Sequence, residues 1–277
     1  MKKIYDVIVV GGGHAGCEAA SASARVGADT ALFTHKIDTI GEMSCNPAIG
    51  GLGKGHLVRE IDALDGLMGK VIDKAGIQFR MLNSSKGPAV RGPRAQADRK
   101  LYKKYMLSYL KEQKNLDLVE ASVEGLFIEN ENCVKGIILS DGQIIESKSV
   151  ILTSGTFLNG IMFIGHQTSV GGRVDDVNCV GITPYLKNLG LNIGRLKTGT
   201  PARLNGKTIN WSVLEEQGGD ENPEPFSYMT DSIKNPQIKC YITHTNEETH
   251  KIIRDNFSKC ALFSGLIKGV GPRYCPS

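Results

Sequence analysis

Hydrophobic and polar positions follow two different periods along the first part of the chain, and the changes of period mark its elements. Residues 4–10 form a short apolar run, rich in β-branched side chains, that stops at Gly11. Such a run is typical of a buried parallel strand that enters a tight turn. Residues 17–26 supply small helix formers, Gly27 ends that helix, and residues 30–34 form a second apolar run. The pattern predicts a right-handed β-α-β unit and a doubly wound α/β fold.

A glycine-rich segment and two helical segments follow this unit. Residues 38–55 keep no steady period, so we expect a long loop shaped by something that it binds. Residues 58–70 regain helical character. Between residues 95 and 114, apolar side chains recur at helical spacing among basic ones. This spacing predicts an amphipathic helix with a solvated cationic face.

Strand patterns dominate the next part of the chain. Asp141 and Gly142 form a turn signal of the kind that joins hairpin strands. We expect a small antiparallel meander that returns to the main sheet, with strands at residues 116–120, 123–129, 134–139 and 144–152. After Gly199 the chain is more polar and is punctuated by prolines, so we place the start of a second domain at residue 200.

Composition narrows the class of protein only slightly. The 277 residues are 40% hydrophobic and carry a formal charge of +4, which permits an anionic partner without requiring one. The seven cysteines have no repeating spacing, which indicates reduced thiols and a cytoplasmic location. No apolar stretch reaches membrane-spanning length, and no pair of histidines has the spacing of metal ligands. We therefore expect neither a membrane segment nor a metal site.

Glycines at positions 11, 13 and 16 form the pattern GxGxxG between the first strand and the first helix. In that context the glycines allow a tight turn, close approach of a pyrophosphate and close packing of the helix, whose amino terminus faces the phosphates. We expect a dinucleotide at this turn. The acidic ribose ligand that usually follows the second strand is replaced by Thr34 and His35.

Six segments of the chain carry a family resemblance: GGGHAG at residues 11–16, MSCNPAIGGLGKGHL at 43–57, LNSSKGPAVRGPRAQADR at 82–99, GRLKTGTPAR at 194–203, CYITHTNEETH at 240–250 and GVGPRYCPS at 269–277. Together they resemble the MnmG (GidA) family of tRNA-modifying flavoenzymes. VILTSG at 150–155 also resembles a late strand and turn of glutathione-reductase-like flavoproteins. The resemblance implies a glutathione-reductase-like FAD-binding Rossmann fold with an inserted meander and the start of a second inserted domain.

The resemblance also implies a reaction, cofactors and partners. Enzymes of this family, together with the GTPase MnmE, add an aminomethyl or carboxymethylaminomethyl group to carbon 5 of the wobble uridine of certain tRNAs. Methylene-tetrahydrofolate supplies the carbon, NADH reduces FAD, and the full-length protein is a homodimer. By this resemblance, residues 1–199 are an FAD-binding domain without its carboxy-terminal segment, and residues 200–277 are part of an inserted NADH and substrate domain. We expect such a truncated chain to bind FAD weakly or not at all.

Particular residues match the functional positions of the family. Cys45 and Cys275 are the expected catalytic thiols, with Cys275 favoured as the nucleophile and the other acting in acid-base chemistry or in closing the site. The expected FAD contacts are Gly11, Gly12, Gly13, His14, Ala15, Gly16, Val123 and Cys179. The expected NADH contacts are Gly271, Pro272, Arg273, Tyr274, Cys275, Pro276 and Ser277.

Other polar residues in the matched segments allow two interpretations. A basic group could meet tRNA phosphate or the folate tail, although a solvated basic face explains Arg99 equally well; the group comprises Lys54, Lys86, Arg91, Arg94 and Arg99. His14 and His56 are either proton carriers or structural hydrogen-bonding groups. We expect four further cysteines to be small, buried hydrophobic side chains; they are Cys17, Cys133, Cys240 and Cys260.

Three other functional classes compete with this hypothesis. A folate- and FAD-dependent tRNA uridine methyltransferase shares the flavin fold but lacks the CNPAIGGLGKGHL segment. A disulfide oxidoreductase needs two cysteines close in sequence, and the chain has no CxxC or CxxxxC. A non-catalytic dinucleotide-binding fragment stays open.

Overall fold

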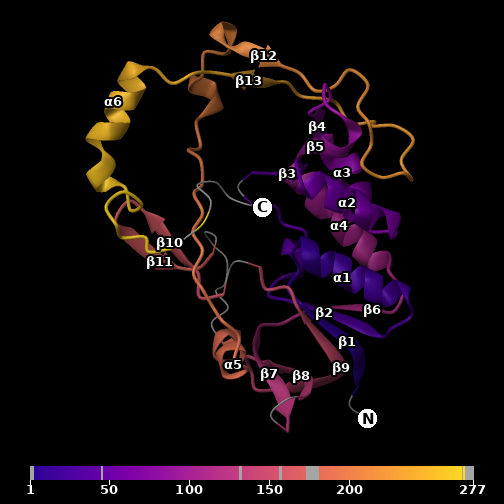
Figure 1. The fold of residues 1–277 in the computed structure, drawn as a ribbon. Helices are drawn as coiled ribbons and strands as arrows, with labels where there is room; N and C mark the ends of the chain where they lie inside the picture. Colours follow the sequence, from indigo (N-terminus) through magenta and orange to yellow (C-terminus); the bar gives the residue numbers. More distant parts are fainter. Residues whose placement is uncertain are drawn as a thin grey trace.

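A six-stranded sheet forms the centre of the molecule. The computed structural model describes residues 3–44, 46–130, 133–155, 158–172, 181–269 and 271. The strands lie in the order β6-β2-β1-β9-β8-β7 (Figure 1). They are β1 (Tyr5–Val10), β2 (Thr30–Thr34), β6 (Leu116–Glu120), β7 (Val123–Glu129), β8 (Cys133–Leu139) and β9 (Ile144–Leu152). The helix α1 (His14–Arg25) connects β1 to the parallel strand β2, so the β-α-β prediction is confirmed.

The sheet changes from parallel to antiparallel at β9. That strand pairs in parallel with β1 on one side and antiparallel with β8 on the other. The assignment of residues 116–120 to the meander is wrong, because β6 pairs in parallel with β2, with Leu32 opposite Leu118. The preceding helix, α4 (Arg99–Glu112), lies beside β6 and forms the crossover that a parallel strand requires.

A second, smaller sheet lies beside the helices. Its strands are β3 (Ala48–Gly50), β5 (Gly92–Ala97) and β4 (Gly76–Leu82), in that order, and all pairs are antiparallel. The segment predicted as one helix over residues 58–70 is two helices, α2 (Lys54–Ala63) and α3 (Met68–Ala75). Between them Asp65 has a φ of 66°, a left-handed conformation that no helix interior accepts.

Residue 98 sets the beginning of α4. The Asp98 Oδ1 atom accepts hydrogen bonds from the backbone N–H of Lys100 at 2.8 Å and of Leu101 at 3.0 Å, and the helix begins at Arg99. Such a cap satisfies two N–H groups that have no partner within the helix. The three residues before Asp98 belong to β5, which is why the helix is shorter than its predicted range.

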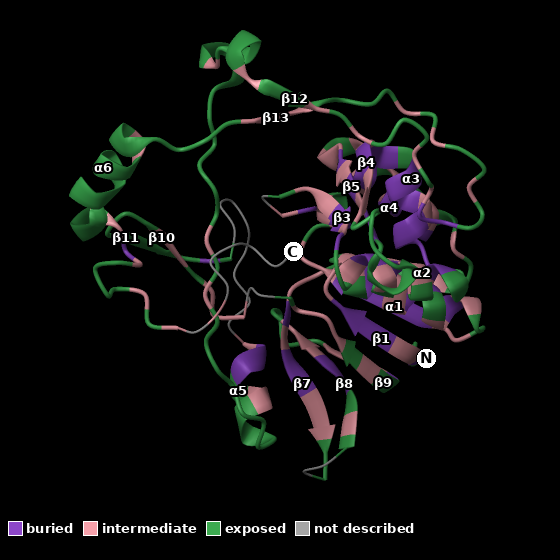
Figure 2. Ribbon diagram, turned by 45° about the horizontal axis from the view of Figure 1, so that its top comes forward, coloured by how far each residue is buried: buried purple, intermediate pink, exposed green. Residues whose placement is uncertain are grey.

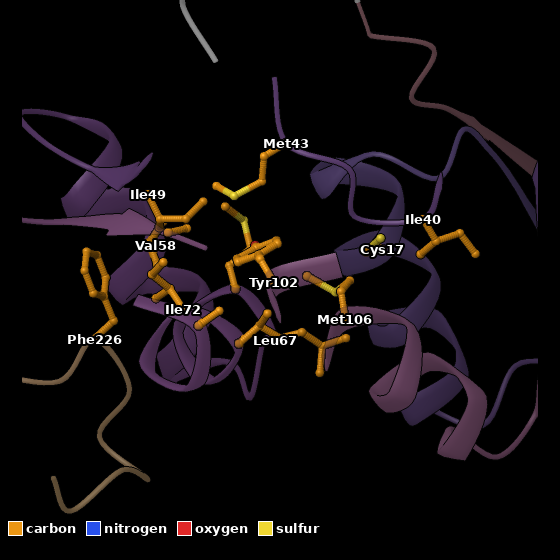
Figure 3. Packing of buried hydrophobic residues seen from close by; sticks show 14 of the residues in the cluster. Cys17, Ile40, Met43, Ile49, Val58, Leu67, Ile72, Tyr102, Met106 and Phe226 are labelled. Atoms are coloured by element: carbon orange, nitrogen blue, oxygen red, sulfur yellow. The ribbon is translucent and has the colours of Figure 1, made fainter. Parts of the chain in front are cut away.

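Two clusters of buried side chains hold the sheets and helices together. One fills the space between the large sheet, α1 to α4 and the small sheet, and Figure 3 shows Tyr102 and Met106 of α4 within it. Phe226, from far along the chain, packs into the same cluster beside Ile49 and Val58. The other cluster lies on the opposite face of the large sheet and includes Val123 and Ile182.

The rest of the chain makes a long excursion with little regular structure. It contains the hairpin β10 (Ile161–Ile164) and β11 (Gln167–Val170), helix α5 (Ile182–Asn188), the pair β12 (Glu215–Gln217) and β13 (Cys240–Ile242), and helix α6 (Glu247–Asp255). Figure 2 shows that α6, β10 and β11 are mostly exposed, whereas buried residues gather in α1 to α4 and in the sheets. Within the described residues, no helix is long and apolar enough to cross a bilayer.

Candidate functional site

At two positions of the turn between β1 and α1, residues 11–16, only glycine fits. Gly11 has a φ of +112°, and a Cβ added there would lie 2.5 Å from the carbonyl oxygen of Thr153. A Cβ added at Gly16 would lie 1.8 Å from the carbonyl oxygen of Gly11. Both distances are far below van der Waals contact. The two glycines therefore let β1 turn sharply and let α1 pack directly against the turn.

Gly13 has a different role from Gly11 and Gly16. It is the N-cap of α1 with an ordinary φ of −75°, and no heavy atom lies within 4 Å of the position of an added Cβ. No side chain caps the helix, and its first turn contains no acidic residue. The N–H groups of the first turn and the positive end of the helix dipole therefore lie beside an open position at Gly13. This arrangement fits the pyrophosphate of a dinucleotide.

Thr153, in the VILTSG segment, fixes the turn from the side. Its Oγ1 atom donates to the carbonyl oxygen of Val10 at 2.8 Å, and its backbone N–H donates to the same oxygen at 2.9 Å. The backbone N–H of Gly11 donates to Phe33 at 2.8 Å. The end of β9, the end of β2 and the glycine turn thus form one rigid unit, which brings together two segments that lie more than a hundred residues apart in the chain.

The end of β2 carries no acidic side chain, as the sequence shows. Thr34 packs against the turn, with its Oγ1 atom 3.0 Å from the position of a Cβ added at Gly12. The neighbouring strand β6 ends in Glu120, whose carboxylate accepts the backbone N–H of Ile37 at 2.9 Å. Glu120 is therefore engaged with the loop after β2.

Of the other residues expected near FAD, His14 and Val123 are described and both have structural contacts. The Nδ1 atom of His14 lies 3.5 Å from the Tyr102 hydroxyl, and the two rings meet edge to face at 5.4 Å. Burial raises the pKa of Tyr102 well above its ordinary value, so its hydroxyl stays protonated. The side chain of Val123 is 3% exposed and packs in the core. Cys179 lies outside the described residues.

The glycine-rich loop that contains Cys45 is folded back on the small sheet. Cys45 itself lies outside the described residues. Gly50, Gly51 and Gly53 all have positive φ, and the N–H of Gly51 donates to the carbonyl oxygen of Pro93 at 2.8 Å. A Cβ added at Gly50 would lie 2.1 Å from the same oxygen. The loop after position 45 is thus a set of tight turns held on β5.

The four described cysteines differ in their degree of burial. Cys17 is fully buried, its Sγ atom donates to the carbonyl oxygen of Gly12 at 3.4 Å, and burial raises its pKa to about 12. Cys240 donates to the Oε1 atom of Gln78 at 3.3 Å, and Cys260 is partly buried. Cys133 is exposed at the start of β8, so its expected buried role is wrong. Its place beside a hairpin loop explains the exposure.

The basic residues of the matched segments separate into engaged and available groups. Arg99 donates to the Glu42 carboxylate at 2.6 Å and to the Met43 carbonyl at 2.9 Å, so its charge is neutralised locally. The Arg91 Nε atom donates to the carbonyl oxygen of Lys86 at 3.0 Å. Arg94 lies opposite Arg80 in the small sheet, a residue that sequence reasoning did not select. Only the pairing of β4 with β5 reveals this contact.

Two further features bear on the predicted ligands. The Nε2 atom of His56 is buried and has no hydrogen-bond partner among the described residues. Gly271 has a φ of +151°, and a Cβ added there would lie 2.7 Å from the carbonyl oxygen of Lys197, so Gly271 lies against the GRLKTGTPAR segment. The other residues of the expected NADH contact, Pro272 to Ser277 with Cys275 among them, lie outside the described residues.

Neither metal chemistry nor a deep pocket competes with the glycine turn in the described part of the chain. No group of three or more His, Cys, Asp or Glu side chains there could hold a metal ion. Two shallow hollows of about 500 and 460 Å³ lie along β6 and at the carboxyl end of α1. Neither hollow is lined by a residue of the turn, and the second lies at the opposite end of α1. The turn is the stronger candidate site because backbone N–H groups at a helix amino terminus bind phosphate.

The chain is similar to a known protein family and to curated relatives. Residues 6–277 match the family model described as glucose inhibited division protein A. A protein of Thermodesulfovibrio yellowstonii is 58% identical over 276 residues, and one of Granulibacter bethesdensis is 57% identical over 275 residues. Each is named tRNA uridine 5-carboxymethylaminomethyl modification enzyme MnmG. The chain is covered at 100% and 99%, but it spans only 44% of the length of each of these curated relatives.

Solved structures show the same relationship. Aquifex aeolicus GidA superposes with a TM-score of 0.90 at 48% identity, over 99% of this chain and 47% of that one. A GidA-related protein of Thermus thermophilus superposes with a TM-score of 0.51 at 21% identity, over 70% of this chain and 72% of that one. The second likeness shows the fold alone, a mixed α/β fold with a parallel, Rossmann-like core.

Proposed function

Because this chain belongs to the glucose inhibited division protein A family, we propose that it is the dinucleotide-binding part of a flavoenzyme that modifies tRNA. The proposed reaction adds an aminomethyl or carboxymethylaminomethyl group to carbon 5 of the wobble uridine. Relatives at 57% and 58% identity carry the name of such an enzyme. Since the chain spans 44% of their length, the activity is proposed for the full-length protein.

The open amino terminus of α1 is the observation that carries this proposal. Gly13 leaves an open position at the amino terminus of α1, while Gly11 and Gly16 let the turn and the helix approach closely. We assign the FAD pyrophosphate to this turn, residues 11–16, with the backbone of Val123 and Cys179 as further contacts. When bound, FAD supplies the redox chemistry that none of the amino-acid side chains can provide.

The two cysteines of the matched segments are proposed to carry the chemistry on uridine. Carbon 5 of uridine is a poor nucleophile until a thiolate adds to carbon 6. We assign this addition to Cys275 and assign acid-base chemistry or closure of the site to Cys45. The loop after Cys45 supports its part, because three glycines with positive φ turn the backbone tightly there. A concentration of backbone N–H groups lowers the pKa of a nearby thiol.

The remaining assignments complete the proposal. NADH is assigned to residues 271–277, methylene-tetrahydrofolate is the carbon donor, and MnmE is the partner GTPase of a cytoplasmic homodimer. We divide the chain into an FAD-binding domain, residues 1–199, and part of an NADH and substrate domain, residues 200–277. Gly271 supports a close association of the segments at residues 194–203 and 269–277, because it packs against Lys197.

The test uses the full-length protein with a substitution at Gly13. Gly13→Val should remove flavin absorbance from the purified protein and the modified nucleoside from cellular tRNA, as measured by mass spectrometry. Gly218→Val is the matched control, because an added Cβ there also meets nothing within 4 Å, but far from the turn. Absence of flavin from the wild-type protein, with unmodified wobble uridine, would contradict the proposal. Formation of 5-methyluridine instead would favour the methyltransferase.

A further inference from the structure

Two arginines lie directly opposite each other in the small sheet. Arg80 of β4 pairs in register with Arg94 of β5, and the next strand places Gly50 opposite Arg94. Directly opposed residues of antiparallel strands project from the same face with their Cβ atoms about 5 Å apart, and like charges there repel each other. Both side chains are partly buried. This arginine pair therefore needs a source of negative charge.

The protein itself does not supply that charge within the described residues. No described carboxylate lies within the 4.0 Å of an ion pair from either guanidinium. With the Gln96 amide turned so that its oxygen faces Arg94, it accepts from both Nη atoms at 3.0 and 3.1 Å, but it is neutral. Asp220, beside β4, directs its carboxylate to the N–H of Met81 at 2.7 Å.

Three other arginines in this part of the molecule have a carboxylate nearby. Arg59 pairs with Glu224, Arg99 pairs with Glu42, and Arg25 lies 3.7 Å from Asp65. The arginine pair differs from these three arginines, because no described carboxylate lies within ion-pair distance of it. Planar guanidinium groups in adjacent positions match the oxygens of a phosphate, to which each can donate two hydrogen bonds.

Further positive charge continues from the arginine pair along the loop between β4 and β5. Lys86 and Arg91 are exposed on this loop. The loop is ordered, because the Nδ2 atom of Asn83 donates to the carbonyl oxygen of Val90 at 3.1 Å and the N–H of Lys86 donates to that of Asn83 at 2.9 Å. A track of several cations on one hairpin suits a polyanion better than a single small anion.

We infer that Arg80 and Arg94 together hold one phosphodiester of the RNA substrate, and that Lys86 and Arg91 contact the adjoining backbone. The inference rests on the proposed function and deepens it by naming where the RNA backbone is held. Pairing of Gly50 with Arg94 joins this phosphate site to the glycine-rich loop that follows Cys45. A phosphate fixed there would set the position of the neighbouring base relative to that loop.

Binding of an anticodon stem-loop RNA to the full-length protein tests the inference. Arg80→Gln and Arg94→Gln should each weaken the Kd about tenfold and lower the slope of log Kd against log salt concentration by about 0.7 to 1. If both arginines hold one phosphate, the double variant should lose no more slope than either single variant. Arg254→Gln is the charge-matched control, since Arg254 lies on the exposed helix α6.

Three results would overturn the inference or separate it from the proposed function. Unchanged RNA binding by the double variant, beside normal binding by the wild type, overturns the inference alone. A raised KM for methylene-tetrahydrofolate with unchanged RNA affinity assigns the pair to the folate tail and also overturns it. No RNA binding by the wild type contradicts the proposed function itself. The thermal midpoint of the double variant should not fall, because the substitution relieves repulsion; a fall would indicate a structural role.

Discussion

The carboxylate of Asp73 accepts a hydrogen bond from the backbone N–H of Phe226 at 2.7 Å, although 153 residues separate the two. Its second oxygen accepts the N–H of Ser227 at 2.9 Å, and Asp62 on the preceding helix accepts the N–H of Tyr228 at 2.9 Å. We call this arrangement the carboxylate clasp. It attaches the excursion to α2 and α3 at the point where Phe226 enters the core.

Removal of one member of the clasp should release this attachment. Asp73→Ala leaves the N–H groups of Phe226 and Ser227 without an acceptor in a buried place. Each orphaned group costs about 1–3 kcal/mol, so we expect the free energy of unfolding to fall by about 2–6 kcal/mol. Hydrogen–deuterium exchange should show faster exchange of both amides, whereas Glu221→Ala, at an exposed position of the same segment, should leave them protected. Unchanged protection in Asp73→Ala would contradict the clasp.

The clasp should also make stability depend on pH. Burial raises the pKa of Asp73 above its ordinary value of 3.8, against the opposing effect of the Ser227 and Phe226 N–H groups. The folded state then binds the proton more tightly than the unfolded chain, so the free energy of unfolding falls as pH rises from about 3.8 to the raised pKa. Urea unfolding across this range should show the fall in the wild type and a weaker one in Asp73→Asn.

A surface carboxylate provides the opposite sign as a control. The pKa of Asp117 is lowered, mainly by its hydrogen bond with Lys3. Its contribution to stability is present above the ordinary value of 3.8 and is lost as pH falls toward the lowered value. Asp117→Asn should therefore remove stability at neutral pH and leave acid stability unchanged. The same sign for both variants would refute the assignment of the two shifts.

Local patterns predicted the strands of the large sheet closely but not all of their partners. The runs at residues 30–34, 116–120, 123–129 and 144–152 agree with the observed strands because their apolar residues reflect burial of each strand. The period of a hydrophobic pattern does not identify the neighbouring strand, so the pattern alone places β6 in the meander. The small sheet was missed because β3 has three residues and β5 contains Gly92, Pro93 and Arg94.

The candidate site likewise contains features that the sequence predicts and features that it does not. The glycine turn was predictable because the whole GxGxxG pattern lies within six residues of sequence, between a strand and a helix. The position of Arg80 opposite Arg94 depends on strand pairing. The carboxylate clasp depends on backbone N–H groups, which the identities of the side chains do not reveal. Interactions of this kind appear only when segments far apart are brought together.

The glycines of the turn should separate stability from ligand binding. Gly16→Ala places a Cβ 1.8 Å from the Gly11 carbonyl oxygen, and Gly13→Ala places one in open space. We expect Gly16→Ala to lower the thermal midpoint strongly. Gly13→Ala should keep the midpoint of the flavin-free protein and lose flavin affinity in the full-length protein. Equal thermal effects of the two variants would contradict the different roles assigned to these glycines.

Thiol labelling should distinguish the described cysteines. Cys17 is fully buried with a pKa of about 12, whereas Cys133 is exposed. A thiol reacts as its thiolate and only where a reagent can reach it. Iodoacetamide at neutral pH should therefore label Cys133 within minutes and label Cys17 only after denaturation, as shown by peptide mass spectrometry. Labelling of Cys17 in the native protein would contradict the packing of α1 against the turn.

Phe226 should link the excursion to the glycine-rich loop. Its ring is fully buried, lies 6.5 Å from that of Phe79, and has its Cζ atom 2.6 Å from the position of a Cβ added at Gly50. Phe226→Ala removes a large side chain from the core, which typically costs about 3–5 kcal/mol. The cavity adjoins Gly50, so the loop that follows Cys45 should lose its support.

This expectation distinguishes support of the loop from simple destabilisation. In the full-length protein, Phe226→Leu should retain most of the stability, because a smaller apolar side chain still fills part of the space. If Phe226 supports the loop, amides at residues 50–53 should exchange faster in Phe226→Leu, while those of α4 stay protected. Phe33→Leu, in the cluster on the opposite face of the sheet, is the matched control and should leave the loop unchanged. Equal exchange of the loop in both variants would show that Phe226 contributes only to general stability.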